Sequence, residues 1–277
     1  KIPIYKIGEE DHSNYIEIVE LQERNSYDTS KPHKHEYIEI FLFNKGGGEH
    51  TIDFKQYPIN HQSVHFVFPN QIHKVKRELN THGHVILVSK EYFSGVDYEL
   101  YGQFFHAFYL QPALNMGKEA FAKIYGLLDL MKQELQEQGN FHQAIVRDYI
   151  HILVKLFMRS QSNLTVPIHD KDFKLYMDLM LNVEETYLAH YPVTYYSEEL
   201  QVSLRRLNTV CQKFHGATCI GVLHDRLILE AKKLLVHSDK SVKEVMFQLN
   251  YKDAAYFNRF FKKKTGLTPT AYQEKST

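Results

Sequence analysis

The sequence predicts an α+β chain in which an N-terminal antiparallel β-barrel precedes a helical connector and an all-α C-terminal domain. Short apolar runs separated by turn residues continue to about residue 110, and a 3.6-residue apolar period begins at about residue 115. An internal repeat occupies the C-terminal third. The predicted domains are 1–112 for the barrel, 113–170 for the connector and 171–277 for the helical domain.

The composition is that of an ordinary globular protein. Of the 277 residues, 43% are hydrophobic and 24% are charged, which excludes disordered, collagen-like and disulfide-scaffold classes. No apolar run approaches the roughly 18 residues of a membrane-spanning helix, and no signal segment is recognisable at the N-terminus. We therefore expect no membrane partner and a cytoplasmic location.

The strands are predicted from β-branched and aromatic runs that end at turn residues. The first is 37–43, followed by the turn Gly46-Gly47-Gly48 and a second strand at 50–54. A third run, 63–68, stops at Pro69-Asn70, and a fourth covers 85–88. Short strands at this spacing indicate an antiparallel barrel or sandwich.

Amphipathic helices are predicted at 118–138, 143–158 and 173–187, with a linker at 163–168. The first has one apolar stripe, formed by Phe121, Ile124, Leu127, Leu128, Met131 and Leu135. Such stripes either pair two chains or pack on the barrel. We favour the first alternative and expect a homodimer.

Charge is divided unevenly along a chain whose total is balanced. Residues 196–277 contain 14 Lys and Arg against 8 Asp and Glu, whereas residues 1–195 contain 19 against 25. A basic C-terminal third favours a polyanionic partner.

The repeat aligns residues 204–219 with 254–269. Asn208 then meets Asn258, and Gly216 meets Gly266. Each copy is predicted to be a short helix, a turn and a second amphipathic helix, at 204–214 and 254–264. Ser203 and Asp253 are predicted N-caps because their side-chain oxygens can accept from first-turn N–H groups. The predicted helix 225–236 joins the copies.

This is the helix-turn-helix arrangement, present twice, in which the second helix of each unit enters the major groove of double-stranded DNA. The alternative is two helical hairpins with solvated charged faces. The predicted DNA-contacting residues are Arg205, Arg206, Asn208, Thr209 and Gln212 in the first copy and Ala255, Tyr256, Asn258, Arg259, Lys262 and Lys263 in the second.

Residues 171–277 resemble the DNA-binding domain of the AraC-type (AraC/XylS) transcription regulators. The resemblance rests on Phe257-Asn-Arg-Phe-Phe-Lys-Lys-Lys-Thr-Gly-Leu-Thr-Pro-Thr-Ala-Tyr272 and on Arg226-Leu-x3-Ala-x2-Leu-Leu235. It implies sequence-specific regulation, more often activation, contact with RNA polymerase, and a DNA contact for Arg259. The chain departs from the family at Asn250-Tyr251 in place of Gly-Phe, at Gln273 in place of Arg, and at Cys211 in place of Phe.

The predicted barrel contains His33-x-His35-x3-Glu39-x6-Gly46, followed by Pro69-x3-His73. Residues 33, 35, 37 and 39 share one face of a regular strand. The spacing resembles the two cupin motifs, whose His, His, Glu and His side chains hold a divalent metal in metal-binding cupins. Sensor domains of AraC-type regulators also resemble cupins, often without a metal.

Our leading interpretation is a transcription regulator controlled by a small-molecule effector in this barrel. The predicted effector contacts are His33, His35, Tyr37, Glu39, Phe41 and His73, in an aromatic interior that also includes Phe43, Phe66 and Phe68. A filled core without a cavity fits the same residues.

The alternative is a metal-dependent cupin enzyme or metal sensor, with the ion at His33, His35, Glu39 and His73. We expect no cofactor and no enzymatic activity, because we find no Gly-x-Ser-x-Gly, phosphate-binding loop or His-Glu-x-x-His pattern.

Overall fold

The computed structural model describes residues 4–5, 15–21, 29–93, 98–160 and 170–276. Contacts divide the chain into two compact units, 2–168 and 169–277. The predicted linker at 163–168 lies outside the described residues. None of the helices in the described part combines the length and apolar character that crossing a bilayer requires.

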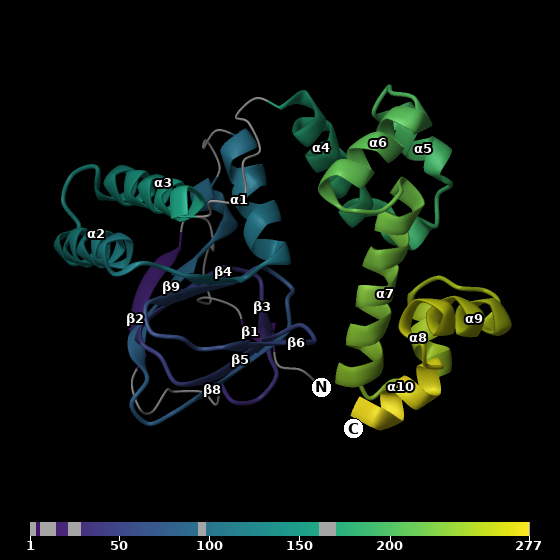
Figure 1. The fold of residues 1–277 in the computed structure, drawn as a ribbon, viewed down its shortest axis with the longest axis horizontal. Coiled ribbons are helices and arrows are strands. Elements are labelled where there is room, and N and C mark those ends of the chain that lie inside the picture. The colour runs from purple at the N-terminus through teal and green to yellow at the C-terminus, as the bar shows by residue number, and fades with distance from the viewer. Residues whose placement is uncertain (1–3, 6–14, 22–28, 94–97, 161–169, 277) are drawn as a thin grey trace. The chain divides into compact units, whose positions relative to one another are not determined.

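The N-terminal unit contains two antiparallel sheets that face each other (Figure 1). The larger has the order β10 (Ala113–Asn115), β7 (Ser63–Val67), β4 (Ile38–Lys45), β9 (His82–Val88) and β2 (Ile16–Glu20). The smaller has the order β6 (Lys55–Pro58), β5 (Gly48–Ile52) and β8 (His73–Arg77). A short parallel pair joins β1 (Ile4–Tyr5) to β3 (Lys34–His35). The four predicted strands are confirmed as β4, β5, β7 and β9.

Strand β4 lies between β7 and β9 and is buried on both faces. Alternate residues of a strand point to opposite faces. Ile38, Ile40 and Leu42 therefore belong to a core on the outer face of the sheet. Phe41 and Phe43 belong to a second core between the two sheets.

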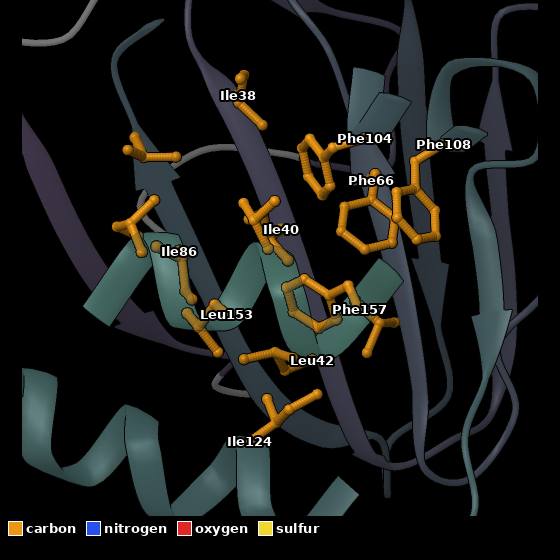
Figure 2. Packing of buried hydrophobic residues seen from close by; sticks show 14 of the residues in the cluster. Ile38, Ile40, Leu42, Phe66, Ile86, Phe104, Phe108, Ile124, Leu153 and Phe157 are labelled. Atoms are coloured by element: carbon orange, nitrogen blue, oxygen red, sulfur yellow. The ribbon is translucent and has the colours of Figure 1, made fainter. Parts of the chain in front are cut away.

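Three helices cover the outer face of the larger sheet: α1 (Tyr98–Leu110), α2 (Lys118–Glu137) and α3 (His142–Ser160) (Figure 1). Figure 2 shows Phe66 of β7 among Phe108 of α1 and Phe157 of α3. The Phe66 ring centroid lies 4.1 Å from that of Phe108 and 5.1 Å from that of Phe157. The helices predicted as a separate connector thus pack on the outer face of the sheet in this unit. The favoured use of the apolar stripe of α2 to pair two chains is not what the structure shows, because Phe121, Ile124, Leu128 and Met131 are buried in this core.

Two expectations for this unit are wrong. Residues 98–110 form a helix rather than part of the strand region, since aromatic side chains recur there at helical spacing and Phe104 and Phe108 pack side by side. Phe66 and Phe68 face these helices rather than the interior, because the β4–β7 register pairs Phe66 with the outward Ile40.

The C-terminal unit is entirely helical apart from its turns in the described residues. Its α-helices are α4 (Lys171–Thr186), α5 (Val193–Glu199), α6 (Leu204–Phe214), α7 (Cys219–His237), α8 (Val242–Gln248), α9 (Ala254–Thr265) and α10 (Pro269–Ser276), with a 3-10 turn at Tyr187–Ala189. One core joins α4, α5 and α6 to the first half of α7. A second joins α8, α9 and Tyr272 to its second half. Helix α7 therefore carries both helix-turn-helix units.

The predicted ends of the two recognition helices are confirmed. Ser203 Oγ accepts from Arg206 N at 3.2 Å, and Asp253 Oδ1 accepts from two N–H groups of α9 at 2.7 and 3.0 Å. Gly216 and Gly266 follow the helices with φ of 75° and 81°, which a residue without a Cβ adopts freely.

The first prediction concerns the outer core, which is the core on the outer face of the larger sheet. We expect Phe66→Ala to lower the free energy of unfolding of the N-terminal unit by about 3–5 kcal/mol, because the change leaves a cavity among packed rings. Urea denaturation followed by near-ultraviolet circular dichroism measures this. Leu79→Ala, at a side chain that is 83% exposed, is the control and should change stability by less than about 0.5 kcal/mol. Equal effects from both changes would contradict the packing described.

Candidate functional site

Five histidines and one glutamate are buried together between the two sheets. Each is at most 2% exposed. They are His33, His35, Glu39, His50, His65 and His73. A buried polar group costs free energy unless it is paired, so a cluster of this size calls for internal partners.

Strand pairing brings these side chains together from distant segments. A backbone bridge joins His33 to His73, with hydrogen bonds of 3.0 and 2.9 Å in the two directions. Strands β5 and β8 pair Ile52 with His73, which makes His50 the diagonal neighbour of His73. Strands β4 and β7 place His65 opposite Phe41.

Three atoms that could bind a metal ion lie close together at the centre of the cluster. His35 Nε2 and His73 Nε2 lie 3.1 Å apart, and Glu39 Oε2 lies 3.3 Å from the first and 3.4 Å from the second. These side chains offer ligand atoms that all lie within 4.8 Å of one another. Two imidazoles and one carboxylate suit first-row divalent metals, so the residues fit the ion that the cupin-like motif implies.

His33, the fourth member of the predicted metal set, takes a different place. Its Nδ1 donates to the Lys31 carbonyl at 2.9 Å, and its ring lies beside that of His73 with centroids 4.1 Å apart. His33 is therefore not one of the three residues whose ligand atoms lie close together. Burial lowers its pKa.

The cluster continues from His73 towards β7. His73 Nδ1 lies 3.1 Å from His50 Nε2, and His50 Nδ1 lies 3.2 Å from His65 Nδ1. Burial holds the pKa of His73 and His50 well below the usual 6.5, and neighbouring imidazoles lower both further. Burial lowers the pKa of His65 to about 4. These three rings are therefore neutral near pH 7 and keep a lone pair.

The six predicted effector residues all lie at this cluster. Tyr37 stacks on His35 with centroids 4.3 Å apart, and Phe41 meets His50 edge-on at 4.9 Å. Sequence reasoning missed His50 and His65, although their alternation with apolar residues in the predicted strands 50–54 and 63–68 was available as a signal.

The predicted DNA-contacting residues lie on helices α6 and α9. Nine of the eleven are exposed: Arg205, Arg206, Thr209, Gln212, Ala255, Tyr256, Arg259, Lys262 and Lys263. Asn208 and Asn258 are partly buried. Their aligned apolar neighbours, including Leu207 and Phe257, point into the cores. Cys211 fills the core position that Phe261 takes in the second copy.

Some of these polar groups already have partners inside the unit. Asn208 Oδ1 accepts from Cys219 N at 2.9 Å and so ties α6 to the start of α7. Arg206 forms an ion pair with Asp172 at the start of α4. In the second copy, Asn258 Nδ2 donates to Ala254 O within its own helix at 2.8 Å.

The turns of the two units have the same backbone geometry. Gln201 and Asn250 hold equivalent places and adopt left-handed φ of 53° and 58°. Asn tolerates this region better than most residues do, and Asn250 Nδ2 also donates to Leu188 O at 3.0 Å. The replacement of the family's glycine by Asn250 is thus accommodated without loss of the turn.

Comparison with known proteins matches both parts of the chain. A model described as "AraC-like ligand binding domain" matches residues 18–145, and one described as "Helix-turn-helix domain" matches residues 196–275. The HTH-type transcriptional activator RhaS of Salmonella arizonae is 25% identical over 241 residues, which cover 86% of this chain and 85% of that protein. The RhaS of Klebsiella pneumoniae is 21% identical over 283 residues, which cover 92% and 91%.

A solved structure of ToxT from Vibrio cholerae is 11% identical and covers 95% of this chain and 98% of its own, with a TM-score of 0.44. The two matched domains occur in the same order as the sheet-containing and helical units described above. The chain belongs to the AraC-type (AraC/XylS) transcription regulators, with a ligand-binding domain followed by a helix-turn-helix DNA-binding domain.

Proposed function

We propose that this regulator reads its operator through the exposed faces of α6 and α9 and responds to an effector bound at the buried histidine cluster. The observation that carries the proposal is that one unit exposes two capped recognition helices while the other unit contains a buried polar cluster. Relatives named as transcriptional activators support activation as its mode of regulation. We further propose that it works with RNA polymerase in the cytoplasm and catalyses no reaction.

The DNA-reading step follows from the side chains that the helices expose. An Arg paired with guanine contributes about 1–3 kcal/mol of discrimination, and Lys contacts to phosphate fix the register without reading sequence. The two helices are expected to occupy major-groove faces about one helical turn, roughly 34 Å, apart. Affinity then falls with salt at a log–log slope of about −0.9 per phosphate neutralised.

The effector-binding step uses the predicted barrel residues. Imidazole nitrogens and the Glu39 carboxylate offer hydrogen bonds to polar groups, and the rings of Tyr37 and Phe41 beside them offer apolar contact. Two chains are proposed to pair through α2 and α3. Leu130 and Ile152, which are 49% and 44% exposed, support this pairing.

The DNA-reading proposal predicts that Arg259→Ala weakens binding to a duplex selected by the unmodified chain by about 1–3 kcal/mol, because a base-edge contact is lost. Electrophoretic mobility shift at fixed salt measures it. Arg159→Ala, at an exposed arginine of the other unit, is the matched control and should leave affinity unchanged. Full affinity in a folded Arg259→Ala chain would contradict the assignment.

Asn208 binds a backbone group outside its own helix, whereas the aligned Asn258 does not, so we expect substitution of the two residues to affect stability differently. We expect Asn208→Ala to lower the free energy of unfolding of the C-terminal unit by about 1–3 kcal/mol, since the Cys219 N–H loses its acceptor. Asn258→Ala removes only an intrahelical contact and should cost less. Thermal denaturation compares the two variants. A larger loss of stability from Asn258→Ala than from Asn208→Ala would contradict these different roles.

Native mass spectrometry of the chain as purified tests the barrel and the dimer together. We expect two 32.7-kDa chains with one non-covalent adduct per chain. The Glu39→Gln chain should lose the adduct, because the change removes the central carboxylate charge and keeps its shape. An unmodified monomer without an adduct would count against both proposals.

A further inference from the structure

One of the three ligand atoms at the centre of the histidine cluster, Glu39 Oε2, is buried and has no hydrogen-bond partner among the described residues. The His35 Nδ1 lies 2.7 Å from the Tyr37 carbonyl oxygen, which can only accept, so Nδ1 carries a hydrogen. His35 Nε2 is then the ring nitrogen left to bind a metal, and it lies 3.3 Å from Glu39 Oε2 and 3.1 Å from His73 Nε2.

The edges of the triangle match those around a metal ion. Zinc binds imidazole nitrogen and carboxylate oxygen at about 2.0–2.2 Å, which places neighbouring ligand atoms about 2.8–3.6 Å apart in tetrahedral or octahedral sites. The three observed separations, 3.1, 3.3 and 3.4 Å, fall within that range. A cation at the centre would be bound by one atom from each of the three side chains and would give Glu39 Oε2 the partner that it lacks.

We propose that the N-terminal unit binds one first-row divalent metal ion through His35 Nε2, Glu39 and His73 Nε2, and that His50 and His65 position the His73 ring for it. The inference deepens the proposed sensing role of the barrel and rests on it for its regulatory meaning. It differs from the sequence prediction in leaving out His33 as a direct ligand and in adding His50 and His65 behind the site.

The role of His50 and His65 follows from hydrogen-bond direction. With Nε2 of His73 on the metal, its Nδ1–H donates to His50 Nε2 at 3.1 Å. His50 then carries its hydrogen on Nδ1 and donates to His65 Nδ1 at 3.2 Å. The hydrogens on His73 Nδ1 and His50 Nδ1 thus each have one acceptor, and the His65 hydrogen is left on Nε2, which is buried without a hydrogen-bond partner among the described residues. Outer hydrogen bonds of this kind fix the tautomer and orientation of a ligand histidine, and their loss weakens metal binding about 10–100-fold.

The test uses the full chain, stripped with a chelator and titrated with Co²⁺ and Zn²⁺ by calorimetry and by the visible absorption of bound Co²⁺. We expect one ion per chain. Glu39→Gln, which conserves side-chain volume, and His73→Ala should each lose binding while circular dichroism shows a folded chain. His82→Gln, at an exposed histidine outside the cluster, is the matched control and should bind as the unmodified chain does.

A second pair of variants tests the positioning role. His50→Leu removes the acceptor for His73 Nδ1–H, and we expect Co²⁺ affinity to fall about 10–100-fold with a changed Co²⁺ spectrum. His50→Gln retains an acceptor and should recover part of that affinity. A purely structural role for His50 would give equal losses in both variants and would overturn the positioning assignment.

Absence of Co²⁺ and Zn²⁺ binding at tens of micromolar, or full binding by Glu39→Gln, would overturn the metal site. Failure of the proposed function has a different outcome, because DNA affinity is measured on the same samples. An organic adduct without metal would support effector binding and contradict the metal inference alone. A metal-loaded chain whose DNA affinity equals that of the stripped chain would contradict metal sensing and leave the binding site standing.

Discussion

Both faces of strand β4 are buried, and the rest of the N-terminal unit depends on this constraint. Its outward residues Ile38, Ile40 and Leu42 hold α1, α2 and α3 on the sheet, and its inward residues include Glu39. A shift of one residue in register would exchange the two sets, placing a carboxylate in an apolar core and removing it from the imidazoles. The free energy gained by packing the outer core therefore keeps the Glu39 carboxylate buried, although the burial of a carboxylate costs free energy. The register of β4 therefore determines both the packing of the outer core and the position of the Glu39 carboxylate.

Local signals account for what the sequence predicted well. The two helix-turn-helix units are defined by caps, glycines and apolar periods within a few residues of one another, and the structure has them where they were expected. Spacing along one segment also brought His35 and Glu39 to the same site. The roles of His50 and His65 depend on pairing among β4, β5, β7 and β8, which no local pattern fixes. The same limit applies to Phe66, because strand alternation separates two faces without saying which one the helices cover.

The two helix-turn-helix copies are similar in backbone and unequal in chemistry. Asn208 is bound to the start of α7, and Arg206 is paired with Asp172, so part of the polar face of α6 serves the fold of its own unit. Helix α9 exposes Arg259, Lys262 and Lys263. An exposed ion pair such as that of Arg206 contributes at most about 1 kcal/mol, so a phosphate can displace Asp172 at small cost. Asn208 is held by a partly buried backbone N–H and has no such freedom.

Helix α7 limits how this domain can change over evolutionary time. Its first half is built into one core and its second half into the other, so it acts as a rigid spacer between α6 and α9. Inserting one residue would turn one unit relative to the other by about 100° and move it about 1.5 Å along the axis. Operator spacing therefore cannot drift by single-residue insertions in α7. Lineages of such regulators are expected to diversify their binding sites by substitution on the recognition helices while the length of this helix stays constant.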